Sequence, residues 1–269
     1  MHRAESRTET PVGRLDWLSV AFLLGAVLLV YYLVPLVSLV AGQPPGTVLE
    51  RLSTPDVVSA VRTSVFGALA STALATFFGV PLAYWLARAE GPLTTVVTAL
   101  VVLPLVLPPI VSGMVLLTIV GPNTLVGDLA AAAGLPLTRS LVGVVLAQTF
   151  VASPFVVITG RAAIEGVDEG LEHASRSLGK GRLATFRRVT FPLAWPGILA
   201  GVTLTFSRAL GEFGATVMLA YYPRTMPVEI WVSFTTLGLD AAFPIAVILV
   251  CVAVATIVVL NALGRYPLE

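Results

Sequence analysis

The sequence predicts an all-α membrane protein, a bundle of six helices that each cross the bilayer. Charged residues make up 12% of the chain, and the mean hydropathy is +0.93, values that exclude a soluble globular domain. The apolar residues gather in long continuous runs separated by short polar segments. Such runs indicate helices, whose backbone groups are satisfied internally, whereas a membrane β-barrel consists of short alternating strands.

Six apolar runs are long enough to cross a hydrocarbon core of about 30 Å, which roughly 20 helical residues span. The first run follows several arginines and ends in small residues, as a secretory signal does. Its apolar stretch of about 25 residues exceeds the roughly 7 to 15 of a signal peptide, which favours a retained span. The six runs cover about 17–42, 63–87, 93–120, 140–160, 193–222 and 241–264.

Basic residues near the helix ends predict the orientation, because they concentrate on the cytoplasmic side of a membrane. The sequence therefore predicts a cytoplasmic N-terminal segment (1–16), a six-span region (17–264) and a cytoplasmic tail (265–269) of a multi-pass protein in the cell membrane. With both termini inside, 11 of the 16 basic residues are cytoplasmic, namely Arg3, Arg7, Arg14, Arg88, Arg161, Arg176, Lys180, Arg182, Arg187, Arg188 and Arg265.

Prolines and glycines predict where the spans bend and where they pack. Pro104, Pro108 and Pro109 lack backbone donors and predict a kink or a break in the third run. Such a bend either assists gating or fits the helix to its neighbours, and we favour the second role. Gly197 and Gly201 form a small face at the start of the fifth run, which suits close contact with another helix.

A cytoplasmic segment of about residues 164–192 separates the fourth and fifth spans. Its apolar residues fall on one stripe at helical spacing, which predicts a short amphipathic helix. Acidic residues fill the first turns and basic residues the last, as the helix dipole favours. Gly179 and Gly181 predict the end of this helix. The predicted stripe consists of Ile164, Val167, Leu171, Ala174 and Leu178.

An amphipathic helix at this place has three ordinary uses: it lies on the lipid interface, covers the base of its own bundle, or inserts into a partner. The spacing of its residues resembles the EAA loop of permeases in binding-protein-dependent ABC importers. In that pattern Glu-Ala-Ala is followed by a glycine, an aliphatic residue and Leu-Pro. The glutamate is replaced by His173, and Glu172 stands one position earlier. The matching residues are His173, Ala174 and Ser175, then Gly179, and then Val189, Phe191 and Pro192.

This resemblance covers nearly the whole chain, because such permeases also have six spans with the loop after the fourth. It implies that the segment is a coupling helix that seats in a cytoplasmic ATPase subunit. The chain has no G-x-x-x-x-G-K-[ST] loop, so we expect no cofactor on it, with ATP and Mg²⁺ on the partner ATPase. The residues implied in ATPase coupling are Glu172, His173, Ala174, Ser175, Gly179, Arg182, Val189 and Pro192.

Two opposite charges lie near the far end of the fifth run. Arg208 and Glu212 are four residues apart, so they share a helix face and can pair. Arg208 follows Pro192 by about 16 residues, roughly 24 Å along a helix, which places it toward the outer side. Two interpretations stay open: a pair that fixes the helix or an arginine at the outer interface, and a direct role in the transport pathway.

The stretch that contains this pair, R-A-L-G-E-F-G-A-T, is similar to the fifth-span signature of permeases for tetrahedral oxyanions. The following A-Y-Y-P-R-T-M-P-V looks most like the archaeal-type molybdate/tungstate branch. The resemblance implies a homodimer in the lipid bilayer, two ATPase subunits and an extracytoplasmic solute-binding protein. The alternative is a sulfate or thiosulfate importer, whose permease usually pairs two different chains. The implied pathway residues are Arg208, Gly211, Glu212, Phe213 and Gly214.

The remaining residue types argue against other classes of protein. Cys251 is the only cysteine, and His2 and His173 are the only histidines, so we expect no disulfide and no metal site. A membrane-embedded enzyme is the competing class, yet no span contains a serine, histidine and carboxylate set or paired carboxylates. A net charge of +1 gives no bias toward nucleic acid. We therefore expect a transport subunit and no catalysis by this chain.

Overall fold

The computed structural model describes residues 17–264, and every regular element in that range is a helix. The segments 1–16 and 265–269, both predicted to be cytoplasmic, lie outside the described residues. The chain divides after Pro44 into two units, of which the first contains the single helix α1 (Trp17–Ala41). The predicted all-α membrane fold is confirmed.

The helix α1 is apolar around its whole circumference. It has 25 residues and a mean hydropathy of 2.5, and none of its residues is buried. A helix with no polar face suits hydrocarbon, and its length is sufficient to cross it. The bounds of α1 agree with the first predicted run, 17–42.

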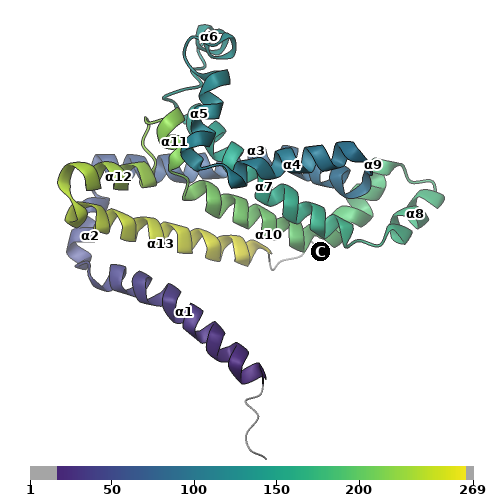
Figure 1. Cartoon of the computed structure of the whole chain (residues 1–269), viewed down its shortest axis with the longest axis horizontal. Coiled ribbons are helices and arrows are strands. Elements are labelled where there is room, and N and C mark those ends of the chain that lie inside the picture. The colour runs from purple at the N-terminus through teal and green to yellow at the C-terminus, as the bar shows by residue number, and fades with distance from the viewer. Residues whose placement is uncertain (1–16, 265–269) are drawn as a thin grey trace, which may run out of the picture. The chain divides into compact units, whose positions relative to one another are not determined.

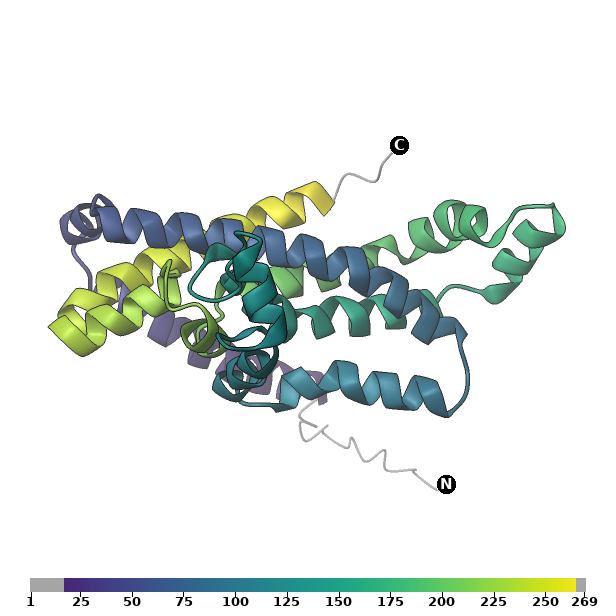
Figure 2. The same cartoon turned by 90° about the horizontal axis from the view of Figure 1, so that it is seen from above.

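Four long helices form the body of the second unit, and shorter ones connect them (Figures 1 and 2). The long helices are α3 (Pro55–Arg88), α7 (Leu141–Glu165), α10 (Phe191–Leu210) and α13 (Leu239–Gly264). The shorter elements are α2 (Pro45–Leu52), α4 (Pro92–Val106), α5 (Pro109–Val120), α6 (Leu125–Ala132), α8 (Glu169–Ser177), α9 (Arg182–Thr185), the π-helical turn η1 (Phe186–Thr190), α11 (Gly214–Leu219) and α12 (Met226–Leu237).

The helices α3, α7 and α10 pack closely because small residues lie at their contacts. A Cβ on Gly201 in α10 would overlap the hydroxyl of Thr159 in α7, and one on Gly160 would lie 3.3 Å from the Cβ of Ala83 in α3. Buried alanine, valine and isoleucine side chains fill the rest of this core. The predicted close contact at Gly197 and Gly201 is confirmed.

The third apolar run is a bent pair of helices instead of one straight span. The axes of α4 and α5 differ in direction by 118°. Leu107 and Pro108 between them have ψ values of 134° and 133°, which interrupt the helical hydrogen bonds. The predicted break at the prolines is thus confirmed. Within residues 17–264, five helices are long and apolar enough to cross a membrane, and the count of six holds when this pair is one span.

The fifth apolar run, predicted as one helix over 193–222, requires a correction. The helical stretch starts earlier, at Arg182, and runs through η1 into α10, which ends at Leu210. A break at residues 211–213 follows, and α11 is a separate short helix. The residues beyond the break, from Gly214 to Tyr222, are again mostly apolar, so hydropathy averaged over the run does not locate the helix end.

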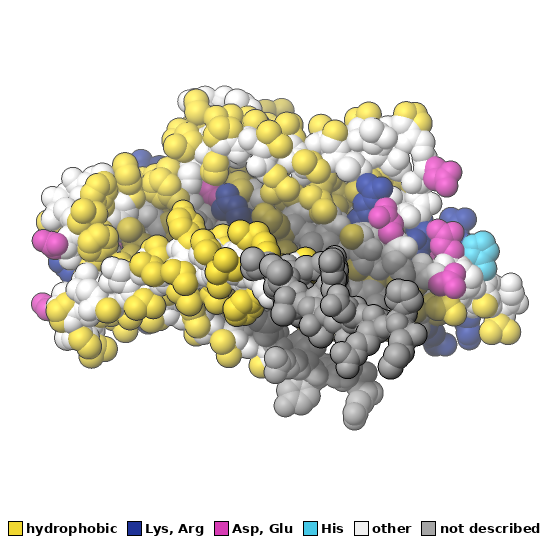
Figure 3. Space-filling model, turned by 60° about the horizontal axis from the view of Figure 1, so that its bottom comes forward, with side chains coloured by type: hydrophobic (Ala, Val, Ile, Leu, Met, Phe, Trp, Pro, Cys, Tyr) yellow, Lys and Arg dark blue, Asp and Glu magenta, His cyan; other side chains and the backbone are white. Residues whose placement is uncertain are grey.

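The surface of the molecule matches a protein surrounded by lipid. Figure 3 shows hydrophobic side chains along the helices, whereas charged side chains gather at the end that holds α8. Large apolar residues of α3 are widely exposed, among them Phe66 at 63%, Phe77 at 72% and Phe78 at 64%. Apolar exposure of this extent marks a surface that contacts membrane or another protein.

Candidate functional site

The predicted coupling segment forms the helix α8 and a glycine turn. Asp168 precedes the helix, and its Oδ1 accepts a hydrogen bond from the backbone N–H two residues later at 2.7 Å. Gly179 has a φ of +81°, a conformation that glycine adopts without a Cβ clash. Its N–H bonds to the carbonyl of Arg176 at 2.9 Å, and the N–H of Lys180 to that of Ser175 at 3.2 Å. These two bonds form a Schellman motif, which confirms the predicted helix end.

The predicted apolar stripe is divided between two environments. Ile164 belongs to the last turn of α7, and Val167 lies in the following loop; both are buried in the core beneath α8. Leu171 and Leu178 are 48% and 82% exposed, and Ala174 is exposed as well. The prediction of a single helix over the whole stripe is therefore wrong. Helix α7 ends at Glu165, and α8 is a separate helix whose own apolar side faces outward.

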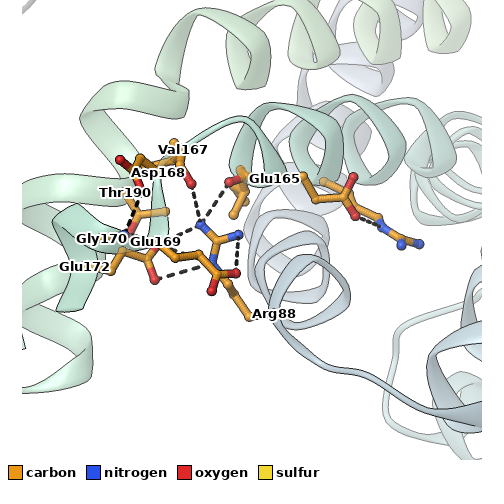
Figure 4. Close-up of polar contacts among 10 residues, drawn as sticks. Arg88, Glu165, Val167, Asp168, Glu169, Gly170, Glu172 and Thr190 are labelled. Atoms are coloured by element: carbon orange, nitrogen blue, oxygen red, sulfur yellow. Dashed lines mark hydrogen bonds and ion pairs between the residues drawn. The ribbon is translucent and has the colours of Figure 1, made fainter.

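Glu172 anchors the opposite side of α8 to the bundle (Figure 4). It is 3% exposed, and its Oε1 accepts a hydrogen bond from Nη2 of Arg88, the last residue of α3, at 2.9 Å. The same Nη2 donates to the carbonyls of Ile164 at 3.0 Å and Val167 at 3.2 Å. The hydroxyl of Thr190 in η1 donates to Glu172 at 2.7 Å. One carboxylate thus joins α8 to α3 and to the turn before α10.

The surroundings of Glu172 keep its carboxyl group ionised. Burial disfavours the charged form and by itself raises the pKa of Glu172. The hydrogen bonds from Arg88 and Thr190, together with the positive charge of Arg88, outweigh burial and hold this pKa below its ordinary value. The ion pair therefore persists throughout the neutral pH range.

The sequence does not predict the contacts of Arg88 and Thr190 with Glu172. In the sequence, Arg88 serves only to predict the orientation of the spans in the membrane. The sequence offers one signal for this pairing. Arg88 lies in the last turn of its span, on the same side of the membrane as the acidic segment that follows the fourth span. This signal does not choose a partner 84 residues away. His173, at the glutamate position of the motif, is exposed, and the buried carboxylate is that of the preceding residue.

A hollow of about 420 Å³ lies beside the Arg88–Glu172 pair. Three of the predicted coupling residues, Glu172, His173 and Arg182, line it. Ser175 contacts the hydroxyl of Thr185 at 3.1 Å, which ties α8 to α9. The hollow is lined by Tyr84, Trp85, Arg88, Ala89, Glu169, Glu172, His173, Arg176, Arg182 and Thr185.

The last two predicted coupling residues lie where the segment enters α10. Val189 is half-buried in η1, and Pro192 is exposed in the first turn of α10. The N–H of Phe191 bonds to the carbonyl of Phe186, five residues earlier. This widened turn precedes Pro192, whose ring would clash with the carbonyl four residues earlier in a regular α-helix.

The predicted pathway residues lie at the break between α10 and α11. Arg208 forms an ion pair with Glu212, whose side chain is 1% exposed. The Oε1 of Glu212 accepts a hydrogen bond from the N–H of Ala215 at 2.8 Å, in the first turn of α11. A carboxylate at this place is stabilised by the helix dipole. Gly211 closes α10, its N–H bonding to the carbonyl of Ser207 at 3.3 Å.

Phe213 and Gly214 set the packing of α11. The ring of Phe213 lies 5.7 Å from that of Trp231 in α12. Gly214 is buried, and a Cβ on it would lie 2.7 Å from the Cβ of Pro109, while one on Gly113 would meet the backbone of α11. The short helix α11 therefore packs directly on α5, so the two interrupted spans contact each other. The coupling and pathway residues lie at opposite ends of α10.

A second charged cluster, also missed from the sequence, fixes the loop after α11. Arg224 donates to Glu229 at 3.0 Å and to the hydroxyl of Tyr222 at 2.6 Å. Burial lowers the pKa of Arg224, but the bond to Glu229 and its charge more than compensate and raise it. The N–H of Met226 donates to Ser64 in α3 at 2.7 Å. These contacts hold the start of α12 against α3.

Comparison with known proteins decides the family. Residues 79–266 match the model of the family described as the binding-protein-dependent transport system inner membrane component. The chain belongs to this family. It is a membrane permease of an ABC importer, as the resemblance to such permeases implied. Its role is that of a transport subunit and not of an enzyme. Permeases of this family work with ATPase subunits and a binding protein.

Individual relatives cover 90% or more of the chain. A probable molybdenum ABC transporter permease protein of Haloferax volcanii is 56% identical over 271 residues, covering 100% of this chain and 99% of its own. The molybdate/tungstate transport system permease protein of Thermococcus kodakarensis is 37% identical over 245 residues, covering 90% of this chain and 94% of its own. These two relatives confirm the resemblance to this branch of permeases.

A solved structure shares the fold. It is the crystal structure of a bacterial alginate ABC transporter in complex with a periplasmic protein that binds an alginate pentasaccharide. The TM-score is 0.68 at 19% identity, with 93% of this chain and 94% of that chain covered. At this identity the likeness shows the fold alone, and it agrees with the helical membrane bundle described above.

Proposed function

We propose that this permease carries molybdate and tungstate into the cell and is driven by a separate ATPase subunit. The relatives at 56% and 37% identity, which are named for molybdenum and for molybdate/tungstate, support this substrate class. Sulfate is a smaller tetrahedral dianion and is the alternative. The two metal oxyanions have the same charge and nearly the same size, so the permease is expected to accept both.

The single observation that carries the coupling role is the arrangement of α8. Its apolar residues Leu171 and Leu178 are exposed, while Glu172 on the other side is held by Arg88 and Thr190. An exposed apolar helix face fits a groove on a partner protein. In this proposal the ATPase displaces α8, and the contacts of Glu172 transmit the displacement to α3 and α10.

The orientation follows from this role. The end with α8 faces the cytoplasm, together with the segments 1–16 and 265–269, in agreement with the concentration of basic residues there. The residues that contact or position the ATPase are those named from the motif: Glu172, His173, Ala174, Ser175, Gly179, Arg182, Val189 and Pro192. ATP and Mg²⁺ bind on the ATPase, and this chain binds no cofactor.

The substrate path runs along α10 in a homodimer with two ATPase subunits and one extracytoplasmic binding protein. The break after Leu210 places Arg208 with its side chain 28% exposed, beside the buried Glu212. The exposed edge of the Arg208 guanidinium attracts an oxyanion, and the ion pair with Glu212 holds the guanidinium in position. Gly211, Phe213 and Gly214 complete this part of the path.

ATP-dependent uptake into proteoliposomes tests the proposal. The vesicles contain this chain, the ATPase subunit and the binding protein encoded beside its gene, and tungstate, molybdate and sulfate compete for uptake. Saturable uptake of the two metal oxyanions without inhibition by sulfate is the expected result. Uptake of sulfate, or activity that requires a second kind of membrane chain, contradicts it. Vesicles with an ATPase variant that does not hydrolyse ATP provide the control.

A further inference from the structure

A basic groove lies on the segment that leads from the glycine turn into α10. It is open and has a volume of about 710 Å³. Three arginines dominate it, and all three are exposed. We call this the arginine groove; it is lined by Gly181, Arg182, Leu183, Ala184, Arg187 and Arg188.

The positive charge of the arginine groove is not neutralised within the described part of the chain. No carboxylate lines it. The ion pairs among residues 17–264 involve Arg88, Arg161, Arg208 and Arg224, and none involves an arginine of the groove. Three exposed arginines that line one groove without a counter-ion favour an anionic ligand, and phosphate matches the hydrogen-bonding geometry of a guanidinium group.

The position along the helix places the groove at the depth of lipid headgroups. Arg187 and Arg188 precede Phe191, the first residue of α10, by three to four residues, about 5 to 6 Å along a helix. The helical stretch from Arg182 to Leu210 qualifies as a membrane span. The headgroup layer on each side of the hydrocarbon core is about 5 to 8 Å thick. Arg187 and Arg188 therefore reach the phosphate layer when the apolar part of α10 lies in hydrocarbon.

Neighbouring side chains fit the same environment. Leu183, within the groove, is 71% exposed and offers apolar surface beside the three charges. Trp195, in the first turns of α10, lies with its ring centre 5.3 Å from that of Phe191, and the two rings are tilted by 48°. Aromatic rings of this kind concentrate at the boundary between headgroups and hydrocarbon. Charge, depth and apolar surface thus point to the same ligand.

We propose that the arginine groove binds the phosphodiester headgroup of an anionic phospholipid, with Arg187 and Arg188 as its phosphate ligands. The acyl chains lie along Leu183 and the start of α10. Basic pockets at the membrane surface bind anionic lipids in this manner, at an affinity that increases with each Lys or Arg. This site depends on the membrane fold alone and not on the transported substrate.

Native mass spectrometry of the full chain, released from detergent micelles, tests the site. Phosphatidylglycerol is titrated against phosphatidylcholine, and retained lipid is counted. The variant R187Q/R188Q removes two phosphate ligands and is expected to weaken phosphatidylglycerol binding at least tenfold, while phosphatidylcholine binding does not change. The matched variant R51Q/R139Q removes two charges elsewhere and is expected to bind like the wild type. Equal binding of both lipids to the wild type, or unchanged binding by R187Q/R188Q, overturns the proposal.

Two further experiments test whether the groove binds a free anion or the ATPase subunit instead of a lipid. Inorganic phosphate added in excess over phosphatidylglycerol is expected to leave the lipid bound; displacement indicates a site for free anions and contradicts a lipid site. Capture of the ATPase subunit is expected to be equal for the wild type and R187Q/R188Q. Loss of capture with unchanged lipid binding assigns the groove to the partner protein and overturns the proposal. Binding of phosphatidylglycerol to the wild type is expected to weaken as salt is added, because salt screens the arginine charges. This measurement needs no variant.

Discussion

Arg88 and Glu172 form an ion pair of 2.9 Å that joins the end of α3 to α8. The side chains are 15% and 4% exposed, so water screens the pair little. The same arginine also satisfies two backbone carbonyls at the end of α7, and Thr190 completes the carboxylate's hydrogen bonds. The short helix that carries the predicted coupling residues is therefore fixed to three parts of the bundle through one buried carboxylate.

Removing the carboxylate is expected to destabilise this end of the protein. Glu172→Ala leaves the guanidinium of Arg88 buried without its counter-ion, at a cost of about 3 kcal/mol. The measurement is thermal unfolding of the full chain in detergent micelles. Glu169→Gln is the matched control, since Glu169 lies 3.7 Å from Arg88 and is 64% exposed. An exposed pair of this kind contributes at most about 0.5 kcal/mol. Equal melting temperatures for the two variants would contradict the role of Glu172.

The stabilisation from Glu172 is expected to disappear in acid. An ordinary glutamate has a pKa of about 4.3. Because the pKa of Glu172 is lower in the folded protein, its contribution is complete above the ordinary value and is lost as the pH falls through the folded value. The melting temperature of the wild type should exceed that of Glu172→Gln by a constant amount from about pH 5 to 8. This difference should shrink below about pH 4. A difference that widens in acid would have the wrong sign.

The glycine turn offers a test of backbone conformation. Gly179 has a φ of +81°, whereas Gly181 has a φ of −69°, and a Cβ on either residue would meet no atom within 4 Å. Gly179→Ala is expected to cost about 1 kcal/mol and to weaken ATPase capture, because alanine disfavours the left-handed region. Gly181→Ala is the control and should behave like the wild type. The same effect from both substitutions would show that the turn does not require this conformation.

The pair Arg208–Glu212 has a structural and a transport interpretation, and variants separate them. Glu212→Ala removes both the counter-ion of Arg208 and the acceptor for the Ala215 N–H, so lower stability and lower uptake are expected. Arg208→Met/Glu212→Gln keeps an acceptor at residue 212 and leaves no buried charge. If this double variant is as stable as the wild type but loses uptake, Arg208 acts in the path. Uptake equal to that of the wild type would limit the pair to packing.

The sequence predicts the spans well because lipid imposes long apolar helices, and it predicts the bend at Pro108 because proline lacks a donor. It does not predict the end of α10 at Leu210, since the chain is again mostly apolar from Gly214 to Tyr222. That end depends on a local contact and a tertiary one: Glu212 accepts the N–H of Ala215 three residues later, and Gly214 packs against Pro109. The contact between Gly214 and Pro109 has no local pattern in the sequence.

The start of α8 is a second feature that the spacing of apolar residues does not predict. Ile164 and Val167 continue the apolar spacing of α8, yet they belong to the core under it. Gly166 ends α7, and Arg88 binds the carbonyls of both apolar residues. The separation into two helices therefore depends on an arginine 76 residues from Ile164, which no periodicity in the segment reveals.

A double-mutant cycle on Arg88 and Glu172, read out as ATP-driven oxyanion uptake by the complete complex, tests most directly that the two residues transmit motion as a unit. The account predicts that Arg88→Met and Glu172→Gln each reduce uptake at least tenfold, and that the double variant is no worse than either single variant, because both remove the same connection. Full uptake by either single variant, or losses that multiply in the double variant, would contradict it.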